Sequence, residues 1–179
     1  MGKKSKSKNS VLGFVFAALV LVGLVLAIVG MFVGQVAVTT SSKLAGVSGT
    51  KMLNLFDGDV WGVEEVLGKK VGVSNAFGII SFIVAVVGAV ILAIDCILNL
   101  FLGKNIKIIR FVGIAVTFVG AVLVLVAGLV MASQCGEYLS LDWGNLAEVK
   151  YTAGTGVWLG FVGGLVAAVA GGLSLAFNK

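Results

Sequence analysis

One acidic side chain, Asp95, lies inside a long apolar stretch of the sequence. A charged carboxylate inside a membrane costs from about 2.5 to over 10 kcal/mol, depending on its depth and on its access to water. Asn99 follows one helical turn later, and we expect Thr117 at a similar depth on the next apolar stretch. These intramembrane polar residues could form a proton or cation site. Alternatively, Asp95 is neutral or ion-paired and fixes the helix register, which its position near the end of the stretch favours.

A second cluster of candidate ligands is acidic and lies between the first two apolar stretches. It consists of Asp57, Asp59, Glu64 and Glu65. These residues lack the alternating ligand pattern of an EF-hand loop, so we expect a solvated turn rather than a Ca²⁺ site. His is absent from the chain, which removes the commonest metal ligand and general base. No nucleophile–base set or phosphate-binding loop is present either, so we expect a non-enzymatic protein without metal or cofactor.

Of the two cysteines, Cys96 is expected inside the membrane and Cys135 at the outer end of a helix. A disulfide requires Cα atoms within about 7 Å of each other. We therefore expect no bridge between them, and we interpret Cys96 as a small apolar packing residue.

A regular row of small residues runs along the last apolar stretch. Its members recur every four residues: Gly156, Gly160, Gly164, Ala168 and Gly172. Side chains four residues apart share one helix face. A face of Gly and Ala lets two helix backbones approach closely in lipid. This face could pack inside a bundle or form an oligomer interface, because both uses need the same chemistry.

The elements that must hold these residues are transmembrane helices. The chain has 179 residues, of which 59% are hydrophobic and only 12% are charged. Soluble domains carry about 25% charged residues, and a chain of this length could not hide so much apolar surface from water. The composition therefore predicts an integral membrane protein whose main partner is the lipid bilayer.

Four segments reach the length of about 20 apolar residues that a spanning helix needs. They are residues 11–33, 77–102, 108–132 and 154–177. Residues 1–10 form a basic tail that we expect to be disordered, and the connecting segments are 34–76, 103–107 and 133–153. The first apolar run is too long for a secretory signal core, so we expect it to remain uncleaved. Short connections make sequential helices antiparallel neighbours, which predicts an all-α, four-helix antiparallel transmembrane bundle.

The distribution of charge predicts the orientation of this bundle. One side holds eight basic residues and no acid: Lys3, Lys4, Lys6, Lys8, Lys104, Lys107, Arg110 and Lys179. The other side holds five lysines and seven acids: Lys43, Lys51, Lys69, Lys70, Lys150, Asp57, Asp59, Glu64, Glu65, Glu137, Asp142 and Glu148. Basic residues favour the cytoplasmic side. We therefore expect both termini and the 103–107 turn in the cytoplasm, in a plasma membrane or bacterial inner membrane.

All three Trp residues (Trp61, Trp143 and Trp158) and both Tyr residues (Tyr138 and Tyr151) fall on the outer side of the membrane in this arrangement. These aromatic residues could form an interfacial belt. Alternatively, Trp61, Trp143 and Phe56 pack the outer segments into an ordered cap. The β-branched run at 36–40 predicts two or three short strands, and a short amphipathic helix around 61–67 is the alternative.

This layout of four spans, cytoplasmic ends and a long first outer segment resembles the claudin-like tetraspan architecture. The claudin signature of Trp, Gly-Leu-Trp and two Cys is missing, because Trp61-Gly62-Val63 stands there without Cys. We therefore assign no family. We predict a scaffold, assembly or accessory subunit that contacts a protein partner or a second copy through a helix face or its outer segments, and no nucleic acid. The alternative is a subunit of a small oligomeric channel or transporter that uses Asp95.

Overall fold

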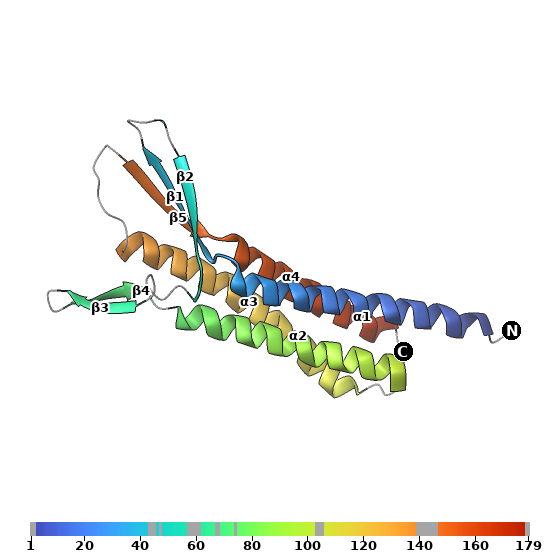
Figure 1. The fold of residues 1–179 in the computed structure, drawn as a ribbon. Helices are drawn as coiled ribbons and strands as arrows, with labels where there is room; N and C mark the ends of the chain where they lie inside the picture. The colour runs from blue at the N-terminus through green and yellow to red at the C-terminus, as the bar shows by residue number, and fades with distance from the viewer. Residues whose placement is uncertain are drawn as a thin grey trace.

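The computed structural model describes residues 3–42, 46, 48–56, 62–66, 69–73, 75–102, 106–138 and 147–177. Its four helices are α1 (Lys3–Phe32), α2 (Ala76–Leu102), α3 (Lys107–Tyr138) and α4 (Thr155–Phe177). They form an antiparallel bundle (Figure 1). We call the end where α1 begins and α4 finishes the tail end, and the opposite end, where the strands gather, the sheet end.

Each helix carries an apolar stretch long enough to cross a membrane. The candidate spans are Val11–Phe32, Ala76–Leu102, Lys107–Gly136 and Thr155–Phe177. Large apolar side chains point outward from the bundle, such as Ile108 at 77% and Phe111 at 69% exposed. Lipid tails solvate such a surface, whereas water does not. The predicted four-helix membrane bundle is confirmed.

Two helices extend further than the sequence predicted. The tail expected to be disordered is helical from Lys3, since no Pro or Gly interrupts residues 3–10. Helix α3 continues six residues past residue 132, to Tyr138. Its extra turns include Cys135, which is completely buried at the sheet end, so burial beneath the strands stabilises the added helix.

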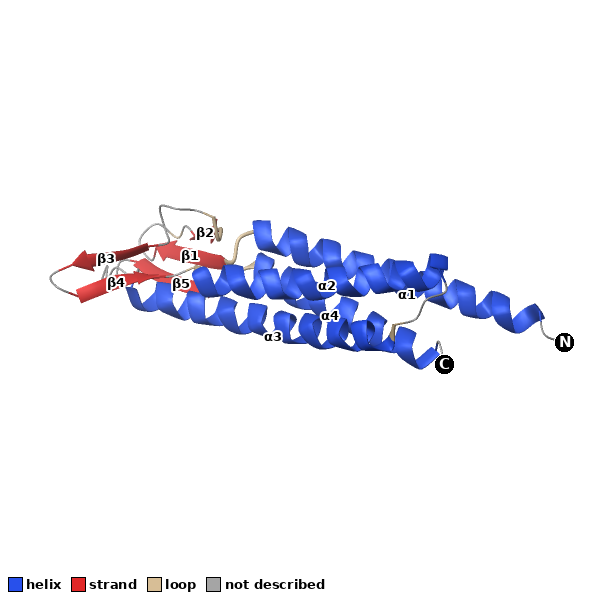
Figure 2. Cartoon of the chain, turned by 90° about the horizontal axis from the view of Figure 1, so that it is seen from below, coloured by secondary structure: helices blue, strands red, loops and turns tan. Residues whose placement is uncertain are grey.

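The strands gather beyond one end of the four helices (Figure 2), and three of them form an antiparallel sheet in the order β2–β1–β5. The strands are β1 (Val36–Ser42), β2 (Ser48–Leu53) and β5 (Ala147–Ala153). Strand β1 directly follows α1, and β5 directly precedes α4. Because α1 and α4 pack against each other, the strands that extend from them, β1 and β5, are also neighbours at the sheet end. They pair from Val36 opposite Ala153 to Ser42 opposite Ala147.

A separate hairpin consists of β3 (Gly62–Val66) and β4 (Lys69–Val73). The strands expected between α1 and α2 are therefore present, and the alternative helix around residues 61–67 is wrong, because residues 62–66 are extended and paired with β4. The sequence analysis did not predict β5.

Helix backbones approach closely in two pairs, α1 with α4 and α2 with α3. A Cβ atom added to Gly163 would lie 2.7 Å from the carbonyl oxygen of Gly23 on α1. A Cβ atom added to Gly120 would lie 2.5 Å from the Cα atom of Ala85 on α2. Only small residues allow such contacts, which supply dispersion energy where lipid removes the hydrophobic drive.

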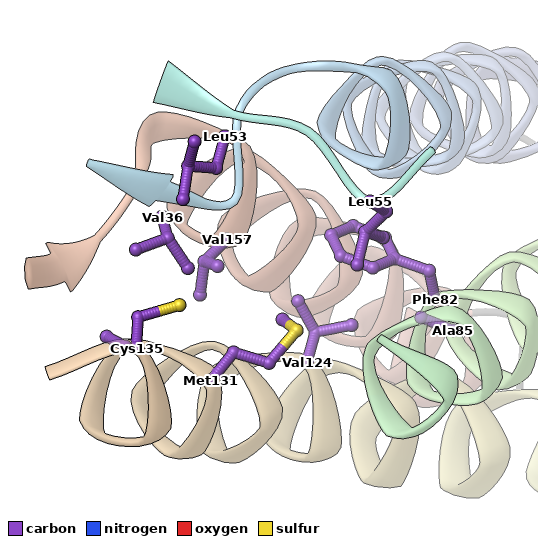
Figure 3. Close-up of a cluster of buried hydrophobic side chains, with 10 residues drawn as sticks. Val36, Leu53, Leu55, Phe82, Ala85, Val124, Met131, Cys135 and Val157 are labelled. Atoms are coloured by element: carbon purple, nitrogen blue, oxygen red, sulfur yellow. The ribbon is translucent and has the colours of Figure 1, made fainter. Parts of the chain in front are cut away.

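A buried cluster joins the sheet to the bundle. Val36 and Leu53 from the sheet converge with Phe82, Met131 and Val157 from three helices (Figure 3). The sheet is thus packed onto the helices through side chains as well as connected to them by the backbone.

Candidate functional site

The intramembrane acid is ion-paired. Nε of Arg110, on α3, donates a hydrogen bond to Oδ2 of Asp95, on α2. Both side chains are buried, at 0% and 1% exposed. Asp95 is the only acidic residue within the four candidate spans. The pair therefore balances the one negative charge that lies inside the apolar part of the bundle.

From the sequence, Arg110 was expected among the basic residues at the membrane surface, and its ion pair with Asp95 was not predicted. The signal that could have found it is the residue type. Of the 13 basic residues in the chain, Arg110 is the only arginine. The planar guanidinium is suited to buried ion pairs, whereas lysine is more strongly hydrated and suits the surface.

The register of the helices shows which residues surround this pair. A Cβ atom added to Gly171 of α4 would lie 3.1 Å from Leu92 Cδ2 and 3.2 Å from Ile114 Cγ1. These three residues therefore form one layer across α2, α3 and α4. One turn further toward the tail end, each helix contributes a buried polar residue. These residues form what we call the tail-end polar layer: Asp95, Arg110 and Ser174.

Ser174 was not singled out from the sequence. Its side chain is 3% exposed, and its Oγ donates a hydrogen bond of 2.9 Å to the carbonyl oxygen of Gly171. The hydroxyl proton is therefore used within α4, and the oxygen lone pairs remain as acceptors.

The guanidinium of Arg110 has more donors than the surrounding protein satisfies. Its Nη1 and Nη2 atoms are buried and have no hydrogen-bond partner among the described residues. Arginine does not deprotonate in proteins, so these N–H groups stay charged. A buried donor without an acceptor costs about 1–3 kcal/mol, and more when it is charged.

The other two predicted intramembrane polar residues do not join the pair. The Thr117 hydroxyl donates 2.7 Å to the carbonyl oxygen of Gly113 on its own helix, two turns from Arg110. Asn99 is half-buried, one turn closer to the tail end than Asp95. Neither forms a hydrogen bond with Asp95 in the described part of the chain.

The predicted small-residue row faces the inside of the bundle over most of its length. Cβ atoms added to Gly156, Gly160 and Gly164 would collide with Gln35, Phe82 and Ala121, respectively. These neighbours come from the α1–β1 connection, α2 and α3. Ala168 is also buried, at 5% exposed. A Cβ atom on Gly172 would meet nothing within 4 Å.

Near the sheet end, α1 contacts the predicted row, since a Cβ atom added to Gly30 would lie 2.6 Å from the nitrogen of Gly160. Further toward the tail end, the contact between α4 and α1 uses a second row that was not predicted from the sequence. A Cβ atom added to Gly23 of α1 would lie 2.5 Å from the carbonyl oxygen of Gly163 and 2.7 Å from the nitrogen of Ala167. Small residues thus cover two faces of α4, and only one of these faces was recognised from the spacing of four.

A buried amide fixes the junction between helices and sheet. Gln35 is 0% exposed, and its Nε2 donates 2.5 Å hydrogen bonds to the carbonyl oxygens of Gly30 and Val33 at the end of α1. Its backbone nitrogen donates to Leu53 on β2, and its carbonyl oxygen accepts from Gly154, next to α4. One residue therefore ties α1, β2 and the start of α4 together.

The predicted cap is described only in part. Phe56 stacks on Phe32 with ring centroids 5.5 Å apart and is 51% exposed, whereas Trp61 and Trp143 lie outside the described residues. Of the four acids considered as calcium ligands, Asp57 and Asp59 also lie outside the described residues. Among the described residues, no three His, Cys, Asp or Glu side chains gather as a metal site.

Cys96 and Cys135 are both free thiols in buried surroundings. Cys135 lies close to Tyr151 on β5, which is packed against the cluster that joins the sheet to the bundle. Burial raises the pKa of the Tyr151 phenol, and the neighbouring Cys135 adds to the shift. The neutral phenol therefore fits this apolar junction.

The sheet presents a hydroxyl-rich face away from the bundle. Residues directly opposite each other in an antiparallel sheet share a face. Thr39 lies opposite Thr50 and Lys150, and Ser41 lies opposite Ser48 and Glu148. The other face carries the apolar residues that join the core, such as Val36 and Leu53. On β2, the five residues from Ser48 to Met52 are all exposed.

Comparison of the sequence with protein-family models and with curated proteins finds no match. The interpretation of function therefore depends on the geometry of the molecule.

Proposed function

We propose that this protein is a non-enzymatic tetraspan scaffold or accessory subunit that presents its three-stranded sheet to a protein partner at the membrane surface. The observation that carries the proposal is the contrast between the two ends of the molecule. The polar and small residues of the bundle contact each other, whereas the sheet exposes its β2 edge and, on the hydroxyl-rich face, Glu148 and Lys150 of β5.

The bundle behaves as a support in this proposal. Its intramembrane acid is paired with Arg110, and most of its helical glycines contact neighbouring helices inside the bundle. Few polar or small residues therefore remain on the lipid-facing surface for contact with a partner. Within the predicted row on α4, only Gly172 has open space beside it, since a Cβ atom there would meet nothing within 4 Å among the described residues. Contact through the sheet is therefore better supported than contact through the glycine face.

The sheet is held firmly enough to act as a recognition element. Gln35 fixes its base, and side-chain amides add two further ties: Asn54 Nδ2 donates 2.8 Å to Phe32 O, and Asn75 Nδ2 donates 2.6 Å to Leu55 O. A pre-ordered surface binds a partner at a lower entropic cost than a flexible loop.

An oligomeric channel or transporter that uses Asp95 is the competing proposal. The unpartnered nitrogens of Arg110 favour it, because unsatisfied buried polar groups often mark functional sites. The ion pair weighs against it, because it leaves Asp95 buried and already neutralised. Proteoliposomes that carry protons or monovalent cations, with flux abolished by Asp95→Asn, would favour transport over the scaffold.

Site-specific photocrosslinking in native membranes tests the scaffold proposal. A photoreactive amino acid at Thr50, on the exposed edge strand, should give one discrete crosslinked protein product. The same group at Val122, an exposed lipid-facing position on α3, is the matched control and should give lipid adducts only. Lipid or solvent adducts alone from Thr50 would contradict partner binding by the sheet.

A further inference from the structure

The strongest unexplained feature of the molecule is the pair of outer nitrogens on the Arg110 guanidinium. Nε is satisfied by Asp95, but Nη1 and Nη2 are buried without an acceptor among the described residues. Arginine keeps its charge in every protein environment, so the side chain cannot escape this cost by losing a proton. Each buried N–H group therefore lacks an acceptor within the described part of the chain, and its burial is costly unless another oxygen atom accepts from it.

At the level of the ion pair, α4 carries a buried hydroxyl oxygen that can accept a hydrogen bond. Ser174 lies at the level of Asp95 and Arg110, as the contacts of Gly171 with Leu92 and Ile114 establish. Its hydroxyl proton is donated to Gly171, which leaves its lone pairs available. A small molecule between the guanidinium and Ser174 could accept hydrogen bonds from Arg110 and donate one to Ser174 Oγ.

The position of the tail-end polar layer limits which small molecule could bind between Arg110 and Ser174. Arg110 is the fourth residue of α3, about 4.5 Å along the helix from its start, so the layer lies close to the membrane surface at the tail end. A phosphate group there would place an anion beside the Asp95 carboxylate, inside a layer whose pair is already neutral. Water carries no charge and needs only two to four polar partners.

We propose that the tail-end polar layer is a binding site for internal water, held by Nη1 and Nη2 of Arg110 and by Ser174 Oγ. The water completes the hydrogen bonding of the only arginine in the chain and links α3 to α4, as the ion pair links α2 to α3. Ser174 acts as a positioning residue for this water. The inference does not depend on the proposed function of the sheet.

The single arginine makes a direct test possible. Protein grown with nitrogen-labelled arginine and lysine and reconstituted in bilayers gives guanidinium signals from Arg110 alone, separate from the lysine ammonium signals. In water-edited solid-state NMR, the Nη signals should receive magnetisation from water as fast as exposed lysine signals do from the same sample. In a dephasing experiment against lipid phosphorus, the same signals should be unaffected.

Two results would overturn the proposal. Nη signals that receive no water magnetisation would show a dry layer, and signals dephased by phosphorus would show that a lipid headgroup occupies it instead. A pair of variants tests the role of Ser174. Ser174→Ala should slow the transfer from water to Arg110 several-fold. Ser81→Ala removes another buried hydroxyl, which bonds to Phe77 O in the sheet half of α2, and should leave the transfer unchanged.

Discussion

Arg110 on α3 donates a hydrogen bond to Asp95 on α2, so the only arginine of the chain neutralises the only acid within its membrane spans. Removal of one partner leaves the other charge buried and unpaired. We therefore expect Arg110→Met or Asp95→Leu alone to destabilise the protein by about 3–5 kcal/mol. The double variant should recover most of this loss, because two apolar side chains of similar size need no compensating charge.

Reversible unfolding in mixed micelles measures this cycle for the parent, the two single variants and the double variant. If the losses in unfolding free energy of the two single variants add in the double variant, Arg110 and Asp95 do not stabilise each other.

The close contact between α1 and α4 predicts a sharp difference between two glycines on the same helix. In Gly163→Val, the new side chain would press against the backbone of Gly23 and Ala27, at 2.7 Å for the first carbon alone. Overpacking of this kind costs about 1–3 kcal/mol. Gly172→Val adds the same atoms at a position where no atom lies within 4 Å, so its unfolding free energy should match that of the parent.

The same pair of variants bears on self-association. If the open end of the small-residue row is an oligomer contact, Gly172→Val should lower the particle mass measured by light scattering without altering stability. Equal stability of both variants would contradict the helix packing described above.

The sequence predicted the four helices well, because apolar runs of about 20 residues have few alternatives in a chain with so little charge. It did not predict β5, since the pairing of strand 147–153 with β1 exists only because α1 and α4 are neighbours. It also placed Arg110 at the surface. A basic residue at the start of a span usually faces the lipid headgroups. Arg110 points into the bundle because it lies on the face of α3 that packs against Asp95 of α2. Ser174 was likewise not predicted, because its place beside this pair depends on how α4 packs against α2 and α3 and not on a sequence pattern.

The buried amide of Gln35 should control how firmly the sheet is held. Gln35→Met keeps the side-chain volume but leaves the carbonyl oxygens of Gly30 and Val33 without their donor. We expect a loss of about 1–3 kcal/mol, together with faster hydrogen exchange at the amides of β1 and β5. Gln134→Met, at a half-buried position on α3, is the control. Unchanged exchange in Gln35→Met would show that the core cluster alone holds the sheet.

The distribution of charged residues predicts the orientation of the bundle in the membrane. The tail end carries basic residues without acids, so we expect it in the cytoplasm and the sheet outside. In a background without Cys96 and Cys135, Thr50→Cys should react with a membrane-impermeant maleimide added to intact cells, because Thr50 is exposed on β2. Lys107→Cys, at the exposed start of α3, should react only after the membrane is opened. The reverse pattern would invert the molecule and direct the sheet toward cytoplasmic partners, whereas labelling of both positions from one side would contradict the four-span bundle itself.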